Sequence, residues 1–232
     1  MARGVIARSL SQLGLGLVTG TFVALSASPA QAIFYSGVGA ESYAHTYACN
    51  GIDCRNSDYY SLDADCANFV SQALHEGGGL TLIENGNVKP PWFYHSYIIA
   101  GSPVYYWSQS WVSASGLYAQ LRDSDRLSSI ANPTMNLRYS GANPGDIYLY
   151  DWGRGEGFSH VSLATSSGNF YDYSDSSLGI NYKSVTSGYG SRMAQHSPDR
   201  DWAPWNLGYW AEASLFTRTQ MKTKILRIAP AN

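Results

Sequence analysis

Residues 61–79 constrain the chain more than any other segment. They read SLDADCANFVSQALHEGGG, and from Cys66 onward the apolar residues recur at the i, i+3/i+4 and i+7 spacing of an amphipathic helix. The glycines at 77–79 are typical of a helix C-terminus. The segment therefore predicts a helix that begins at Cys66, with a lone cysteine in its first turn.

The N-terminus indicates where the protein acts. Two arginines precede an apolar run, and the AQA triplet at 30–32 has the small-x-small pattern of a signal-peptidase site. The run is shorter than the ~20 apolar residues that a membrane-spanning helix needs. We therefore expect a signal peptide at residues 1–32, followed by one secreted domain at residues 33–232 that has no contact with membranes.

The composition excludes one class of partner. Removing the first 32 residues leaves 13 of the 15 Lys and Arg and all 17 Asp and Glu, so the formal charge becomes 13 − 17 = −4. A nucleic-acid-binding protein should carry a basic stripe, so we expect no nucleic-acid partner. The 18 Tyr and 7 Trp suit sugar or peptide ligands better than phosphate. We expect the protein to be a monomer.

The three cysteines divide into a pair and a single residue. Cys49 and Cys54 bracket the loop CNGIDC, and in an oxidising compartment this spacing can close a local disulfide. Cys66 is then unpaired, and an unpaired thiol in an exported protein is either deeply buried or used. The helix dipole favours its thiolate form, whereas Asp63 and Asp65, which could cap the helix, oppose that form.

A cysteine nucleophile needs a base, and His160 is the best placed of the five histidines. The segment PGDIYLYDW, residues 144–152, alternates as a strand does, and SHVSLATS, residues 159–166, does so again after a glycine-rich connector. Together they predict a hairpin whose second strand opens at His160. A cysteine at a helix N-terminus facing a strand-borne histidine is the arrangement of papain-like catalysis.

These segments, followed by MAQHSPDRDWAPWN at 193–206, resemble in order those of the putative amidase domain family, which is related to NlpC-like and other papain-like cell-wall hydrolases. The resemblance implies an α+β fold with a papain-like core, in which the nucleophile helix packs on an antiparallel sheet. It implies Cys66 as nucleophile and His160 as base. Relatives often carry an acidic DGDG connector before the histidine, whereas this chain reads WGRGEGF, so we expect no metal and no other cofactor.

Two residues compete for the third catalytic position, which orients the histidine. His196, in AQHS, matches the family motif, and Asp172, in NFYDYSD, follows His160 by twelve residues, as suits the next strand of a meander. We assign the role to His196 and keep Asp172 as the alternative, although each could also be structural. For the oxyanion we expect the backbone N–H of Cys66, with the Tyr60 hydroxyl as a second candidate donor.

The sequence thus predicts a secreted cysteine amidase or peptidase that hydrolyses an amide bond, by analogy in a cell-wall peptide or peptidoglycan-type substrate. The aromatic stretch at 90–112 is the expected substrate wall. Three alternatives stay open. They are an acyltransferase with the same residues, a non-catalytic module that binds cell wall or glycan, and a zinc amidase, for which the HExxH pattern is absent.

Overall fold

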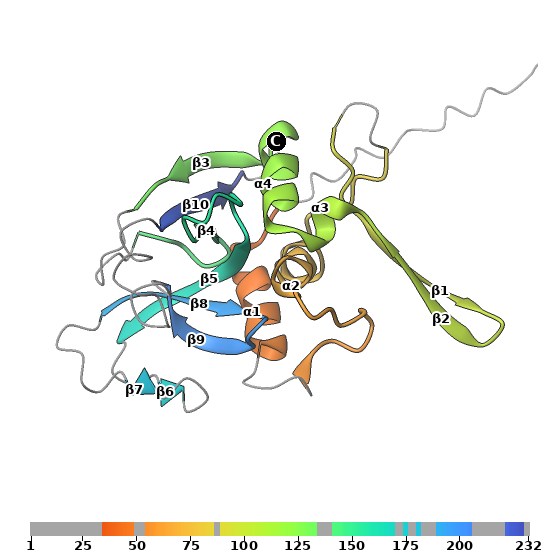
Figure 1. Cartoon of the computed structure of the whole chain (residues 1–232), viewed down its shortest axis with the longest axis horizontal. Coiled ribbons are helices and arrows are strands. Elements are labelled where there is room, and N and C mark those ends of the chain that lie inside the picture. The colour runs from red at the N-terminus through yellow and green to blue at the C-terminus, as the bar shows by residue number, and fades with distance from the viewer. Residues whose placement is uncertain are drawn as a thin grey trace, which may run out of the picture. The chain divides into compact units, whose positions relative to one another are not determined.

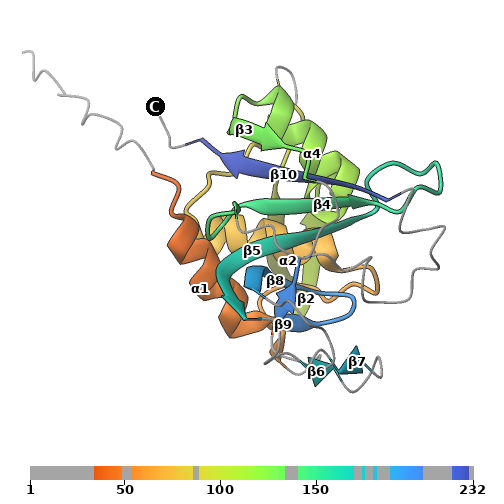
Figure 2. The same ribbon diagram turned by 90° about the vertical axis from the view of Figure 1, so that its left-hand side faces the viewer.

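A six-stranded antiparallel sheet organises the fold, and helices pack along one of its faces (Figure 1; Figure 2). The strand order is β3-β10-β4-β5-β8-β9. The computed structural model describes parts of one compact unit, Ala32–Asn232, and these parts are residues 34–48, 54–85, 89–133, 141–169, 174–175, 180–181, 189–205 and 221–229.

The described helices and strands have the following bounds. The strands of the large sheet are β3 (Leu127–Ala131), β4 (Ile147–Asp151), β5 (His160–Asn169), β8 (Tyr189–Gln195), β9 (Arg200–Pro204) and β10 (Lys222–Ile228). The two small sheets are the hairpin of β1 (Tyr94–Ile99) and β2 (Ser102–Trp107) and the pair of β6 (Ser174–Asp175) and β7 (Ile180–Asn181). The helices are α1 (Gly37–Tyr47), α2 (Cys66–Gln72), the π-helical η2 (Ala73–Gly77), α3 (Gln109–Val112) and α4 (Ala114–Asp123).

Strand β4 shows why the sheet is buried on both faces. Successive side chains of a strand point to opposite faces. Ile147 and Leu149 accordingly join the core beneath the helices, while Tyr148 and Tyr150 join a second core that includes Trp205. The alternation predicted for this segment is therefore present, but with apolar or aromatic residues on both faces.

The predicted hairpin is confirmed. β4 and β5 pair antiparallel, with Ile147 opposite Leu163 and Tyr150 opposite His160. His160 opens the second strand, as expected. The α+β class predicted from the sequence is also confirmed by the combination of helices and antiparallel sheets.

The helix predicted from Cys66 is present, and its second half is a π-helix that ends at Gly77. The prediction that acidic side chains cap it is wrong for Asp65. This residue occupies the N-cap position, but its side chain makes no capping hydrogen bond, because Oδ1 accepts from Leu62 and Asn68 and Oδ2 binds His196. Within the described residues, no helix is both long and apolar enough to cross a membrane.

Two glycines allow the contribution of a close backbone contact to be measured. Gly145 and Gly155 both have positive φ, 83° and 85°, which favours glycine. A Cβ at Gly145 would lie 2.4 Å from the Cα of Gly37, whereas one at Gly155 would meet nothing within 4 Å.

We expect Gly155→Ala to lower the free energy of unfolding by about 1–2 kcal/mol, the cost of the left-handed backbone alone. Gly145→Ala should cost at least ~1–3 kcal/mol more, because the backbone at Gly37 must also shift. Urea denaturation of the two variants measures both values. Equal losses would show that the contact at Gly37 contributes nothing.

Candidate active site

Cys66 is the first residue of α2 and the free cysteine of the described chain. Its side chain is 8% exposed, and the backbone N–H of Val161 hydrogen-bonds to its sulfur. Val161 directly follows His160, so the thiol and the imidazole lie at the same end of β5. The thiol of Cys66 therefore lies against the backbone at the start of β5, next in the chain to His160, and the roles of nucleophile and base stay predictions.

The ring of His160 is oriented by Gln195. The Nε2 atom of His160 lies 2.8 Å from Oε1 of Gln195, and Nε2 of Gln195 donates to the carbonyl oxygen of Pro198 at 2.9 Å. Because that second bond fixes which end of the amide faces the ring, Nε2 of His160 must donate. The neutral ring then has its lone pair on Nδ1, and Nδ1 is the atom that can accept a proton.

Burial keeps both groups neutral. It raises the pKa of the Cys66 thiol, although hydrogen bonds from the backbone N–H groups of Val161, Ala67 and Cys66 itself act in the opposite direction. Burial also lowers the pKa of His160 to about 4; the hydrogen bond to Gln195 opposes this effect, and the charge of Arg200 adds to it. At neutral pH the free site therefore holds a thiol and an imidazole, and not the thiolate that the helix dipole alone would favour.

His196 does not contact His160, although the sequence assigns it the orienting role. Its Nδ1 lies 2.5 Å from Oδ2 of Asp65, and its Nε2 lies 2.8 Å from the carbonyl oxygen of Tyr47. The two partners of the ring are thus a side-chain carboxyl oxygen and a backbone carbonyl oxygen. The side chains of His196 and Asp65 are only 1% and 2% exposed. Gln195, and not His196, hydrogen-bonds the ring of His160, while His196 binds the residue that precedes Cys66, and the identity of the third catalytic residue stays a prediction.

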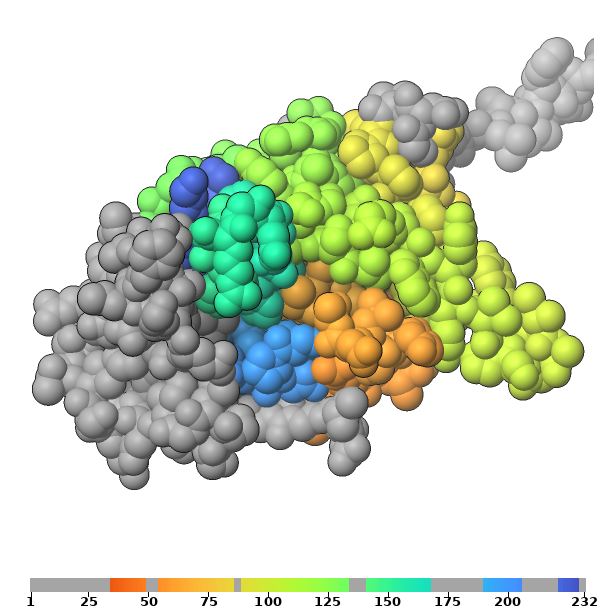
Figure 3. Space-filling view, viewed as in Figure 1, coloured from red at the N-terminus to blue at the C-terminus, as the bar shows by residue number. Residues whose placement is uncertain are grey.

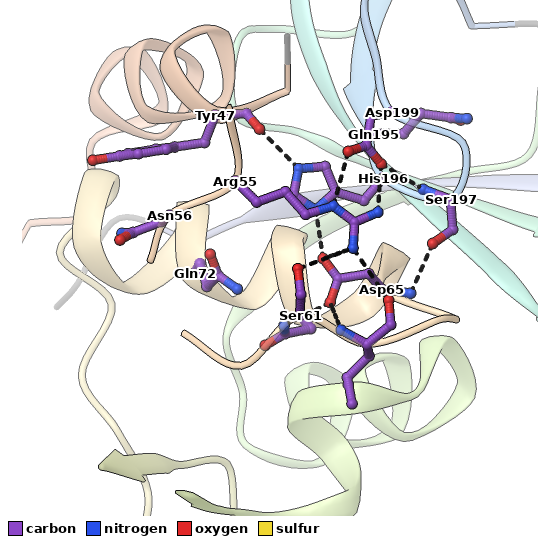
Figure 4. A network of polar contacts seen from close by, with 12 residues as sticks. Tyr47, Arg55, Asn56, Ser61, Asp65, Gln72, Gln195, His196, Ser197 and Asp199 are labelled. Carbon is purple, nitrogen blue, oxygen red and sulfur yellow. Dashed lines mark hydrogen bonds and ion pairs between the residues drawn. The ribbon is translucent and has the colours of Figure 1, made fainter. Parts of the chain in front are cut away.

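Further polar contacts surround the pair of His196 and Asp65 (Figure 4). Arg55 makes two hydrogen bonds to the carboxylate of Asp199, at 2.8 and 2.6 Å, and lies 3.7 Å from Oδ2 of Asp65. The backbone N–H of Asp65 donates to Oγ of Ser197 at 2.9 Å. The turn after β8 is therefore tied to the loop before α2 by several independent contacts.

A bulge in β9 determines which residue faces Gln195. Met193 pairs with Ala203, but Gln195 pairs with Arg200, so β9 contributes one residue more than β8 between these pairs. Trp202, within the bulge, has a φ of 59°. The bulge thereby places a positive charge close to His160.

Of the other predicted residues, Tyr60 and Cys54 are among the described residues, and Asp172 and Cys49 are not. Tyr60 forms its hydrogen bonds through its backbone, while its ring stacks on Trp107 of the β1–β2 hairpin, so its role as an oxyanion donor stays a prediction. Asp172 and Cys49 lie outside the described residues, and the disulfide between Cys49 and Cys54 also stays a prediction. In the described part of the chain, no three His, Cys, Asp or Glu side chains are grouped so that they could hold a metal ion.

Comparison with known protein families shows which family the chain belongs to. Residues 34–218 match the family described as "putative amidase domain", and this range includes Cys66, His160 and Gln195. The chain belongs to the putative amidase domain family. Amidases are hydrolases that act on C–N bonds, so family membership agrees with the class of reaction predicted from the sequence.

One curated relative is similar over part of its length. It is "Uncharacterized protein YjcM" of Bacillus subtilis (strain 168), which is 29% identical over 169 residues. The alignment covers 68% of this amidase-family chain and 35% of the relative, so the chain spans about a third of that protein's length. No solved structure matches the chain.

Substitutions at Gln195 and His196 should separate the two roles. We expect Gln195→Ala to lower turnover at least ~10-fold, because the His160 ring loses the partner that fixes its tautomer. Its free energy of unfolding should fall by only ~1–3 kcal/mol, the cost of an unsatisfied buried donor. His196→Ala should instead cost ~3–5 kcal/mol of stability, because it leaves a cavity where the buried ring stacks on Phe69 and removes one hydrogen bond from Asp65.

Urea denaturation and turnover at a saturating substrate concentration, measured on both variants, test this assignment. If His196→Ala left stability intact and abolished turnover while Gln195→Ala remained fully active, the assignment would be reversed.

The lowered pKa of His160 predicts how stability depends on pH. An unfolded histidine takes up a proton near pH 6.5, whereas folded His160 does so near pH 4. Between these values the unfolded state binds more protons, so the free energy of unfolding falls as the pH is lowered, by up to ~3 kcal/mol. His160→Gln should remove this contribution. Urea denaturation of both proteins at pH 7 and pH 4 measures it, and parallel losses in the two proteins would refute the assigned pKa.

Proposed function

We propose that the protein is a secreted cysteine amidase or peptidase in which Cys66 is the nucleophile, His160 the base and Gln195 the residue that orients the base. The observation that supports this most is the pair of hydrogen bonds made by Gln195. They hold the imidazole in the tautomer whose Nδ1 can accept a proton. The Cys66 sulfur accepts a hydrogen bond from the backbone N–H of Val161, the residue after His160. The proposal further requires the sulfur and Nδ1 of His160 to come within hydrogen-bond reach of each other during the reaction.

The reaction proceeds by acyl transfer through the sulfur. The thiol proton of Cys66 moves to Nδ1 of His160 as the sulfur attacks the amide carbonyl carbon. His160 then gives that proton to the leaving nitrogen, the C–N bond breaks and a thioester forms. Water, deprotonated by His160, attacks the thioester and releases the carboxylic acid and the thiol.

Charge therefore develops during the reaction and is not already present in the free enzyme. The imidazolium that forms at His160 is stabilised by Oε1 of Gln195, a neutral acceptor that does not charge the resting ring. For the oxyanion, the backbone N–H of Cys66 at the start of α2 is the candidate donor. Both groups are set in place before the substrate arrives, which is the source of electrostatic catalysis.

The substrate class and the location are proposed by analogy. The family is an amidase family, and the predicted signal peptide and the proposed papain-like site are features of exported cell-wall hydrolases. We therefore take the substrate to be a cell-wall peptide. The aromatic stretch predicted as a substrate wall forms the β1–β2 hairpin, whose exposed residues include Tyr97, Ile98 and Tyr106.

Digestion of purified peptidoglycan in H₂¹⁸O, followed by mass spectrometry, tests the function. We expect new amine and carboxylic acid ends, with ¹⁸O in the acid. Cys66→Ala should abolish the reaction and His160→Gln should slow it at least ~10²-fold, a typical size for general acid–base catalysis. Ser129→Ala, on the exposed face of β3, is the matched control and should retain full activity.

Activity that persists in Cys66→Ala would refute cysteine catalysis. If added glycinamide captured the acyl group faster than water did, the protein would be an acyltransferase with the same site.

Thiol labelling of Cys66 gives an independent check of the site. Native protein should take up one equivalent of iodoacetamide at Cys66, faster as the pH rises, because burial raises the pKa of this thiol. Label at Cys49 or Cys54 before reduction would contradict their pairing.

A further inference from the structure

A cavity of about 460 Å³ lies along one face of the β1–β2 hairpin, and none of Cys66, His160 and Gln195 lines it. Its walls come from residues 57–59, the end of η2 and one face of the hairpin. Figure 3 shows the hairpin, in yellow-green, beside the loop that precedes α2, in orange. The volume is within the ~300–1,000 Å³ usual for small-ligand sites.

The two sides of this cavity differ in chemistry. Asp58 and Glu76 line one side with carboxylates, and none of the described lining residues is a Lys or Arg. The imidazole of His75 also lines the cavity, with its Nε2 3.9 Å from Oε1 of Glu76. Tyr59 donates to Oε1 of Glu76 at 2.6 Å, which holds the carboxylate in place and leaves its second oxygen available. The Glu76 side chain is 48% exposed, so a ligand can reach it.

The hairpin supplies the apolar side. Ser96 pairs with Tyr105 and Ile98 with Pro103, and cross-strand partners share a face, so these four residues form one surface. All four line the cavity, together with Tyr94. Aromatic faces of this kind attract a cation and also cover the methylene groups that carry it.

We infer that this cavity is a distal substrate subsite for a primary ammonium group on an alkyl chain, the chemistry of a lysine-type side chain. The carboxylates of Asp58 and Glu76 bind the ammonium, and the side chains of Ile98 and Tyr105 cover the alkyl chain. This inference rests on the proposed function, because the cavity becomes a substrate subsite only if the chain cleaves a peptide.

The loop before α2 connects the cavity to the nucleophile. The N–H of Tyr60 donates to the hydroxyl of Tyr94 at 2.6 Å, and Asn68 donates to the carbonyl oxygen of Tyr60 at 3.0 Å. Ten residues of helix separate Cys66 from Glu76, or ~15 Å at 1.5 Å per residue. An extended peptide covers this distance in about four residues. The subsite therefore recognises a side chain remote from the scissile bond and should affect binding more than turnover.

Calorimetry on the Cys66→Ala variant tests the subsite without catalysis. The probes are acetyl-Gly-Lys-Gly-amide and its norleucine analogue, which lacks only the ammonium group. We expect the lysine peptide to bind at least ~10-fold more tightly at low salt, the size of one charge-assisted hydrogen bond. Adding Glu76→Gln, which keeps an acceptor for Tyr59, should abolish this difference, and Asp58→Asn should reduce it. Glu84→Gln, at an exposed carboxylate that does not line the cavity, is the matched control and should leave it unchanged.

Equal binding of the two peptides, or a preference that survives Glu76→Gln in a folded variant, would overturn the subsite. These outcomes are separate from failure of the proposed function. If the wild type hydrolyses peptides through Cys66 but binds both probes equally, only the subsite is wrong. If the lysine preference is present while Cys66→Ala remains active, cysteine catalysis is wrong and the cavity is a cation site of another activity.

Discussion

The buried pair of Asp65 and His196 is the contact on which the geometry of the candidate site depends. It joins the residue before Cys66 to the residue after Gln195, although the two partners are 131 positions apart in the chain. Removing one partner of a buried polar pair is costly, because the other partner loses a hydrogen bond that water cannot replace. The turn before Cys66 and the end of β8 are therefore held together at this pair. Arg55, Ser197 and Asp199 add to it from the same two loops.

Local patterns predicted the elements of the site, and only the structure could show how they meet. The helix from Cys66 and the hairpin that opens at His160 follow from the spacing of apolar residues, which depends on near neighbours. The third residue depends on which of two adjacent side chains faces β5. The AQHS segment contains both Gln195 and His196, and the family motif drew the assignment to the histidine. An amide next to that histidine was the available signal, since an amide oxygen can accept from an imidazole as a carboxylate does.

Local sequence patterns also could not predict the protonation states of Cys66 and His160. In the sequence, the helix dipole and the nearby acids shift the pKa of the Cys66 thiol in opposite directions. Neither effect takes account of how deeply the thiol is buried. Dipole effects contribute ~0.3–1 kcal/mol, whereas desolvation of a fully buried group can shift its pKa by several units. Burial therefore dominates at both Cys66 and His160, and each rests in its neutral form. Asp65 likewise fails to act as a helix cap, because His196 binds one of its carboxylate oxygens and Leu62 and Asn68 bind the other.

The bulge in β9 has a consequence for the chemistry of the base. In a strand without the extra residue, the pairing of Met193 with Ala203 would continue so that Asp201 stood opposite Gln195 in place of Arg200. A carboxylate there would favour the imidazolium of His160, whereas the guanidinium disfavours it. In the structure, Asp201 instead binds His45 of α1 at 2.7 Å. One residue of strand length thus sets the sign of the charge beside His160, and a single deletion in β9 would exchange that charge with no substitution among the surrounding side chains.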